Sequence, residues 1–108
     1  MKGRWIVNTV LPVGLANFTS EVMNNKEPVL VDFWASYCAP CRNLKPILAE
    51  VAKSAKVVTV DIEAEPELAG HFNVSTIPTL VVFKEGKAGN RLVGVQPANK
   101  LLELVKAA

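Results

Sequence analysis

The sequence has only two cysteines and a single histidine, which leaves few soft ligands for a transition metal. A structural zinc site takes four ligands, so here it would have to recruit carboxylates. Lysine and arginine are scattered without any cluster of five, and the net charge is only +2. This distribution lacks the basic surface that nucleic-acid-binding proteins present to phosphates. No apolar run approaches the roughly 20 residues that cross a bilayer. We therefore expect no metal, no nucleic acid and no membrane among its partners.

The length of the chain is that of one ordinary domain. Half of its 108 residues are hydrophobic, which is enough for a packed core without disulfide or metal cross-links. The sequence has no repeat, low-complexity segment or linker. We expect a single domain over residues 1–108, in which residues 1–9 form a short N-terminal extension.

The N-terminus faintly resembles a secretory signal, because Lys2 and Arg4 precede an apolar run over residues 5–16. Polar residues and Pro12 interrupt this run, and cleavage near Ala16 would remove the first predicted strand. We therefore expect no export and a cytoplasmic location. In such a compartment two cysteines are more typical of a redox-active pair or a metal site than of a structural bridge.

Runs of β-branched and aromatic residues alternate with helical spacings along the chain. The near-continuous apolar run at 29–34 is typical of a strand buried on both faces of a sheet. The pattern predicts the order βαβαβαββα, an α/β fold whose first strands are parallel and whose sheet ends in an antiparallel hairpin with its turn at 84–87. Strands are predicted at 10–13, 29–34, 57–62, 79–83 and 91–95, and helices at 17–25 (capped by Asn17), after Cys38, at 66–72 and at 97–107.

The two cysteines, Cys38 and Cys41, are separated by Ala39 and Pro40. Proline suits the first turn of a helix, where its missing N–H would be unpaired. A thiol at a helix N-terminus is stabilised as a thiolate by free N–H groups and by the helix dipole. We therefore predict that Cys38 is the exposed thiol that attacks a target disulfide. Cys41, one turn further along, is predicted to be the buried thiol that resolves the mixed disulfide.

Two other interpretations of the cysteine pair are a zinc site and an inert bridge. His71 is the only histidine, and it falls in a different predicted helix, so a zinc site has a poor ligand set. An inert bridge would be reduced in the cytosol. Both are less favoured than redox exchange.

Asp32 lies inside the apolar run at 29–34, where an unpaired charge is costly to bury. Burial is expected to raise the pKa of its carboxyl, which would make Asp32 a proton donor and acceptor near neutral pH. The alternative is an edge position from which the carboxylate reaches solvent. Asp32 lies near the end of the predicted strand that leads into the cysteines, so we favour a role in proton transfer with Cys41.

The segment Thr76-Ile77-Pro78-Thr79 directly precedes a predicted core strand. A proline at this place is a candidate for a cis peptide bond, which would present the backbone of Ile77 to an extended peptide. Trp34 and Tyr37, beside the cysteines, are expected to contribute apolar contact surface.

These residues together resemble the thioredoxin family over nearly the whole chain, from Val10 to the final helix. The CxxC motif alone is weak evidence, but the ordered set with these spacings is highly specific. It consists of Val29-Leu30-Val31-Asp32-Phe33-Trp34-Ala35, Cys38-Ala39-Pro40-Cys41, Pro46-Ile47-Leu48, Ile77-Pro78-Thr79-Leu80-Val81-Val82-Phe83, and Gly94 between Val93 and Val95.

The resemblance implies a five-stranded mixed sheet flanked by four helices and a cis bond before Pro78. It implies a monomer that reduces protein disulfides without a bound cofactor and is recharged by a thioredoxin reductase. It also implies Cys38 as nucleophile, Cys41 as resolving thiol and Asp32 as the proton-transfer group. The implied docking surface for disulfide-containing targets comprises Trp34, Tyr37, Ala39, Pro40, Thr76, Ile77, Pro78, Val93, Gly94 and Val95.

Three positions depart from the family pattern. Tyr37 stands where the family has Trp, and Ala39 stands where it has Gly, so the redox potential is expected to differ. Thr59 stands where many members have a Lys that pairs with the buried acid, so the pKa of Asp32 is expected to be higher still.

Two rival functions follow from the same residues. The first is a thiol oxidase or isomerase on the same fold, against which the Ala39-Pro40 pair, Ile77 and the doubtful export signal argue. The second is a non-catalytic binding module in which the cysteines are incidental. Replacing both cysteines by serine would leave such a module functional and would abolish a reductase.

Overall fold

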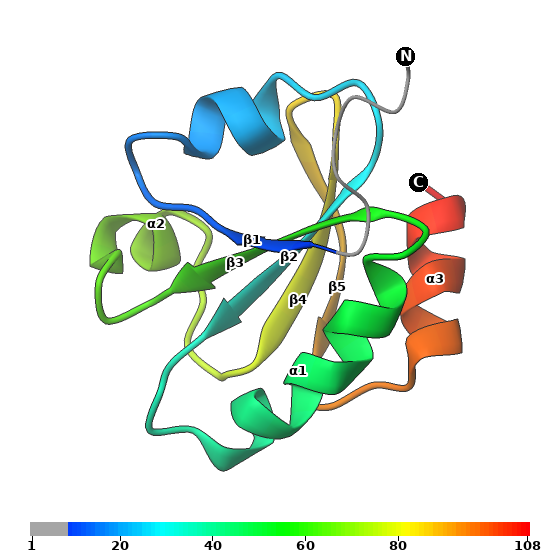
Figure 1. The fold of residues 1–108 in the computed structure, drawn as a ribbon. Coiled ribbons are helices and arrows are strands. Elements are labelled where there is room, and N and C mark those ends of the chain that lie inside the picture. The colour runs from blue at the N-terminus through cyan, green and yellow to red at the C-terminus, as the bar shows by residue number, and fades with distance from the viewer. Residues whose placement is uncertain (1–8) are drawn as a thin grey trace.

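The computed structural model describes residues 9–108, so the predicted N-terminal extension lies almost entirely outside the described residues. Within residues 9–108, five strands and three α-helices follow one another with one short π-helix near the start (Figure 1). They are β1 (Val10–Pro12), η1 (Thr19–Met23), β2 (Val29–Trp34), α1 (Ala39–Val51), β3 (Lys56–Asp61), α2 (Pro66–His71), β4 (Thr79–Lys84), β5 (Lys87–Val93) and α3 (Ala98–Lys106). The predicted order of elements is therefore confirmed.

The five strands form one mixed sheet in the order β1-β3-β2-β4-β5. β1 and β2 pair with β3 in parallel, while β4 runs antiparallel to both β2 and β5. Strand β2 therefore lies at the centre, and its residues 29–33 are all buried. This confirms the prediction of a strand covered on both faces.

Two hydrophobic clusters pack against the two faces of the sheet, as the helices on either side of it suggest (Figure 1). Val31 and Phe33 of β2 join Val22 of η1 and Leu68 of α2 in the first cluster. Leu30 joins residues of α1 and α3 in the second. Because side chains alternate along a strand, Asp32 lies on the same face as Leu30, toward α1.

The first helix differs from the prediction in extent and in its capping residue. It is a π-helix over Thr19–Met23 instead of a helix over 17–25, and Asn17 does not cap it. The Asn17 side chain instead accepts a hydrogen bond from the Gly14 N–H at 2.8 Å. It thereby closes the turn before the helix, a local backbone bond typical of asparagine.

The last strand is the second correction, because β5 covers Lys87–Val93 instead of 91–95. The hairpin turn consists of Glu85 and Gly86 alone, with φ of 51° and 81°, and Lys84 pairs directly with Lys87. Two central residues with positive φ are typical of the tight turns that match strand twist. Residues 87–90 are exposed and lack large apolar side chains, so an apolar pattern does not reveal this part of the strand. An edge strand has little of its surface in the core.

The other boundaries lie within a residue or so of the predicted ones. Along residues 9–108 the structure has no helix with the length and apolar character that crossing a membrane requires.

Candidate functional site

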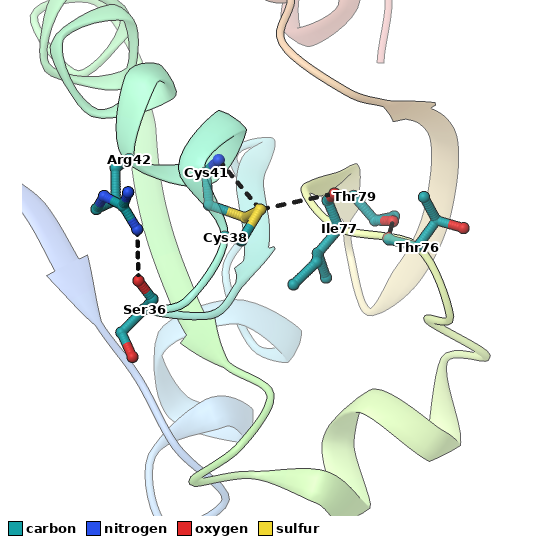
Figure 2. The surroundings of a disulfide bond; sticks show 7 residues. All are labelled: Ser36, Cys38, Cys41, Arg42, Thr76, Ile77 and Thr79. Carbon is teal, nitrogen blue, oxygen red and sulfur yellow. Dashed lines mark hydrogen bonds between the residues drawn. A yellow bond between two sulfur atoms is a disulfide. The ribbon is translucent and has the colours of Figure 1, made fainter.

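The two cysteines lie where the chain leaves β2 and enters α1. Cys38 is the N-cap of α1 in an extended conformation, and Ala39 and Pro40 begin the helix. Cys38 and Cys41 form a disulfide with 5.2 Å between their Cα atoms, within the ordinary range for this bond. The Cys41 N–H donates a hydrogen bond to Cys38 Sγ at 3.2 Å (Figure 2). A backbone donor from the first turn therefore faces the sulfur that would carry negative charge after reduction.

The two cysteines differ in exposure, but less than the sequence predicts. Cys41 is 1% exposed, and Cys38 is only 9% exposed, so Cys38 is largely covered and not the open thiol we expected. One reason is the backbone of Ile77, whose carbonyl oxygen lies 3.8 Å from Cys38 Sγ (Figure 2). The order of accessibility nevertheless remains the predicted one.

The loop that contains Ile77 precedes β4, and its Ile77–Pro78 bond is cis, as predicted. The Thr79 hydroxyl donates a hydrogen bond to the Thr76 carbonyl, which closes the loop on itself (Figure 2). The Gly94 N–H, just beyond β5, donates to the Pro78 carbonyl at 2.9 Å. Segments distant in the sequence therefore meet beside the disulfide.

The predicted docking residues occupy these converging segments. Tyr37 (66%), Val93 (49%) and Val95 (44%) are among the most exposed large hydrophobic residues. Ala39, Pro40 and Thr76 are exposed, while Trp34, Ile77 and Gly94 are half-buried. Pro78, immediately before β4, is buried, so its side chain adds little to a contact surface, in contrast to the prediction.

Asp32 is buried in the central strand, with 3% of its surface exposed. Its Oδ1 atom accepts no hydrogen bond from any described residue. Burial raises the pKa of Asp32 from 3.8 to about 7, the direction that the sequence predicts. The alternative of a carboxylate on an exposed edge strand is therefore wrong, because β2 has a neighbour on both sides.

A cavity of about 310 Å³ links Asp32 to Cys41. Its lining is mostly apolar and includes Trp34 and Leu48, and Thr59 lies beside Asp32 on the neighbouring strand. A carboxyl group and the inner cysteine therefore line the same cavity.

Sequence reasoning missed two basic residues on α1. Lys45 lines the cavity, and its Nζ lies 5.1 Å from the centroid of the Trp34 ring, a cation–π contact. Its spacing of four residues from Cys41 was the available signal, since such residues share a helix face. Arg42 donates a hydrogen bond from Nη1 to the Ser36 carbonyl at 2.8 Å (Figure 2). This bond ties the β2–α1 connection to the helix.

In the described range, 9–108, no three His, Cys, Asp or Glu side chains gather closely enough to hold an ion.

The fold and the site together define a dithiol–disulfide oxidoreductase, in which two cysteines at a helix N-terminus interconvert between thiols and a disulfide.

Comparison with known proteins identifies the family. The family model described as Thioredoxin matches residues 9–107, and the chain belongs to the thioredoxin family. It is 41% identical over 90 residues to a thioredoxin of Pyropia yezoensis, covering 80% of this chain and 84% of that one. It is 38% identical over 91 residues to a bifunctional thioredoxin reductase/thioredoxin of Mycobacterium leprae, covering 81% of this chain and 20% of that protein.

A solved structure supports the same assignment. A point mutant of a thioredoxin from Halobacterium salinarum superimposes with a TM-score of 0.88 at 30% identity, covering 97% of this chain and 95% of that one. The family and the close cysteine pair make this chain a protein-disulfide reductase that acts by dithiol–disulfide exchange.

Proposed function

We propose that Cys38 is the attacking nucleophile, Cys41 the resolving thiol and Asp32 the group that accepts the Cys41 proton. The observation that carries this assignment is the asymmetry of the pair. Cys38 is the N-cap residue, and its Sγ accepts a hydrogen bond from the Cys41 N–H. Cys41, in contrast, is 1% exposed and lines the same cavity as Asp32.

In the first step the Cys38 thiolate attacks one sulfur of a target disulfide. A bond forms between Cys38 Sγ and the target, the target disulfide breaks, and its second sulfur leaves as a thiolate that takes a proton from water. In the second step Cys41 gives its proton to Asp32 and attacks Cys38 Sγ. The Cys38–Cys41 disulfide forms as the mixed disulfide breaks, and the target sulfur leaves as a thiolate that takes a proton from water. Two electrons have then passed to the target.

The proposed docking surface surrounds Cys38 and consists of Trp34, Tyr37, Ala39, Pro40, Thr76, Ile77, Val93, Gly94 and Val95, together with the backbone of Pro78. Exposed apolar side chains next to backbone carbonyls suit an extended target segment, which binds through main-chain hydrogen bonds and side-chain contacts. Disulfide-containing proteins are the proposed targets.

We further propose that a thioredoxin reductase regenerates the dithiol. The fused Mycobacterium leprae protein joins a reductase to a thioredoxin in one chain, which supports a direct partnership between the two activities. The dithiol itself carries the electrons, so the proposal needs no metal or bound cofactor. A monomer of one domain in the cytoplasm fits this role, since a reducing compartment keeps the pair recharged.

The experiment is the reduction potential of the Cys38–Cys41 couple, measured by equilibration against a dithiol buffer, together with turnover of a disulfide-bonded protein substrate. A reduction potential of about −270 mV is expected for a reductase of this type. A reduction potential of about −120 mV would identify a thiol oxidase instead. As a control, the Cys38→Ser, Cys41→Ser double variant should lose all turnover while keeping its fold. Absence of turnover in the parent protein as well would indicate a binding module.

A further inference from the structure

The side chain of Arg91, on β5, reaches the chain segment that leaves α2. Its Nη1 donates a hydrogen bond to the Asn73 carbonyl at 3.3 Å, and its Nη2 donates to the Phe72 carbonyl. The neighbouring residue Leu92 packs against the cluster beneath α1 and α3, so alternation places Arg91 on the opposite face, toward α2. One guanidinium therefore holds two successive carbonyls at the end of a helix, a favourable place for a cation.

The segment held by Arg91 leads directly into the loop beside the disulfide. The Phe72 ring packs within an aromatic cluster, with centroids 5.1 Å from Phe83 and 5.5 Å from Phe18. Asn73 then reverses the chain with φ of 56°, and the Val74 N–H donates to the Ala69 carbonyl at 2.9 Å. Four residues after Asn73 comes Ile77, whose carbonyl lies beside Cys38 Sγ.

Strand β5 and the residue that follows it hold this loop at both of its ends. Arg91 binds its beginning, at Phe72 and Asn73, and the Gly94 N–H binds its end, at Pro78. Between these points Ser75 and Thr76 are exposed to solvent. A loop pinned at both ends loses less conformational entropy when a target binds than a loop pinned at one end.

We propose that Arg91 is a positioning residue for target binding, which holds the 73–77 loop so that the Ile77 backbone is ready to receive an extended target segment next to Cys38. The inference rests on the proposed docking role of this loop. Arg91 itself does not touch the reacting sulfurs, so it acts on recognition and leaves the dithiol chemistry unchanged.

The test compares Arg91→Ala with Lys87→Ala. Lys87 is an exposed cation at the other end of the same strand, so its removal makes the same change in charge. Arg91→Ala is expected to raise KM for a disulfide-bonded protein by about three- to tenfold, with kcat and the reduction potential unchanged. Lys87→Ala should leave KM within about twofold. Arg91→Lys should recover only part of the loss, because an ammonium lacks the planar fork that spans two carbonyls.

Two further measurements separate this role from others. Amide hydrogen exchange over residues 73–77 should accelerate in Arg91→Ala and not in Lys87→Ala. Reduction of a small aromatic disulfide, which has no backbone to dock, should proceed at the parent rate in both variants. Equal rises in KM for the two variants, a loss of rate on the small disulfide, or unchanged exchange at 73–77 would each overturn the proposal. If the parent protein reduced the small disulfide and no protein disulfide, the docking function would fail, and hydrogen exchange would still decide whether Arg91 holds the loop.

Discussion

Asp32 and Thr59 are direct register partners in the parallel pairing of β2 with β3, and both line the cavity that reaches Cys41. Thr59 is too short and carries no charge to compensate the Asp32 carboxylate. Burial is consequently the cause of the raised pKa of Asp32, and Asp32 Oδ1 receives no hydrogen bond from the described residues. In the proposed mechanism, the composition of this cavity would therefore set the pH at which Asp32 accepts a proton from Cys41.

Placing a cation beside Asp32 should lower its pKa. We expect Thr59→Lys to bring an ammonium group into the cavity and to reduce the pKa of Asp32 from about 7 by about one pH unit or more, because an opposite charge favours the ionised carboxylate. The measurement is a carboxyl-carbon NMR titration of Asp32. Thr59→Met, which fills the same space without charge, should leave the pKa at or above its parent value. A similar decrease in both variants would show that charge is not the cause.

Removing the Asp32 carboxyl should stabilise the protein in a pH-dependent way. The folded protein keeps a proton that the unfolded chain releases above pH 3.8, so the free energy of unfolding falls as the pH rises from about 4 to about 7. This loss of unfolding free energy is complete above about pH 7. It amounts to on the order of 4 kcal/mol, because the pKa of Asp32 rises from 3.8 to about 7 on folding. Asp32→Ala and Asp32→Asn should both lack this slope.

Denaturant unfolding at pH 4, 6 and 8 checks this expectation. The advantage of either variant over the parent should grow with pH and disappear near pH 4. Both variants should also slow the exchange reaction near neutral pH, because Cys41 loses its proton acceptor. A destabilised variant that retains full activity at pH 7 would contradict both the energetic and the catalytic role of Asp32.

The order of the two thiols should be visible in trapped intermediates. Cys41→Ser leaves Cys38 able to attack a target but removes the thiol that resolves the mixed disulfide. We expect stable mixed disulfides with a disulfide-bonded protein, detected as bands of increased mass on non-reducing gels and by mass spectrometry. Cys38→Ser, in which only the buried Cys41 remains, is the matched control. It should form at least about tenfold less mixed disulfide than Cys41→Ser. Equal trapping by the two variants would refute the assignment.

Two glycine-to-alanine substitutions should change stability in opposite directions. Gly94 has φ of 90°, a conformation that costs a non-glycine residue about 1–3 kcal/mol, so Gly94→Ala should be destabilising. Gly70 lies within α2 and a methyl group there meets no atom within 4 Å, so Gly70→Ala should stabilise by about 0.5–1 kcal/mol. Thermal unfolding of both variants measures the difference. Destabilisation of similar size in both would show that the backbone conformation at Gly94 is not the reason.

The local features of the site were predictable because short patterns determine them. The apolar run around Asp32 indicates a strand covered on both faces, and the structure places it at the sheet centre with a raised pKa. Pro40 after Cys38 indicates the start of a helix, and α1 begins there. The same reasoning failed at β5 and at Asn17, where an edge position and a side-chain bond to Gly14 are decided by neighbours that the local sequence does not reveal.

The order of strands and helices, the cysteine pair at a helix start, the buried acid and the family could all be deduced from the amino-acid chain alone. These depend on residue types at short spacing, which periodic apolar patterns and local sterics encode. Two relationships required the folded molecule: the Ile77 backbone covers Cys38, and Arg91 holds the loop that begins after α2. They join residues far apart in the chain, and they depend on strand order and register, which are fixed when both faces of the sheet are packed.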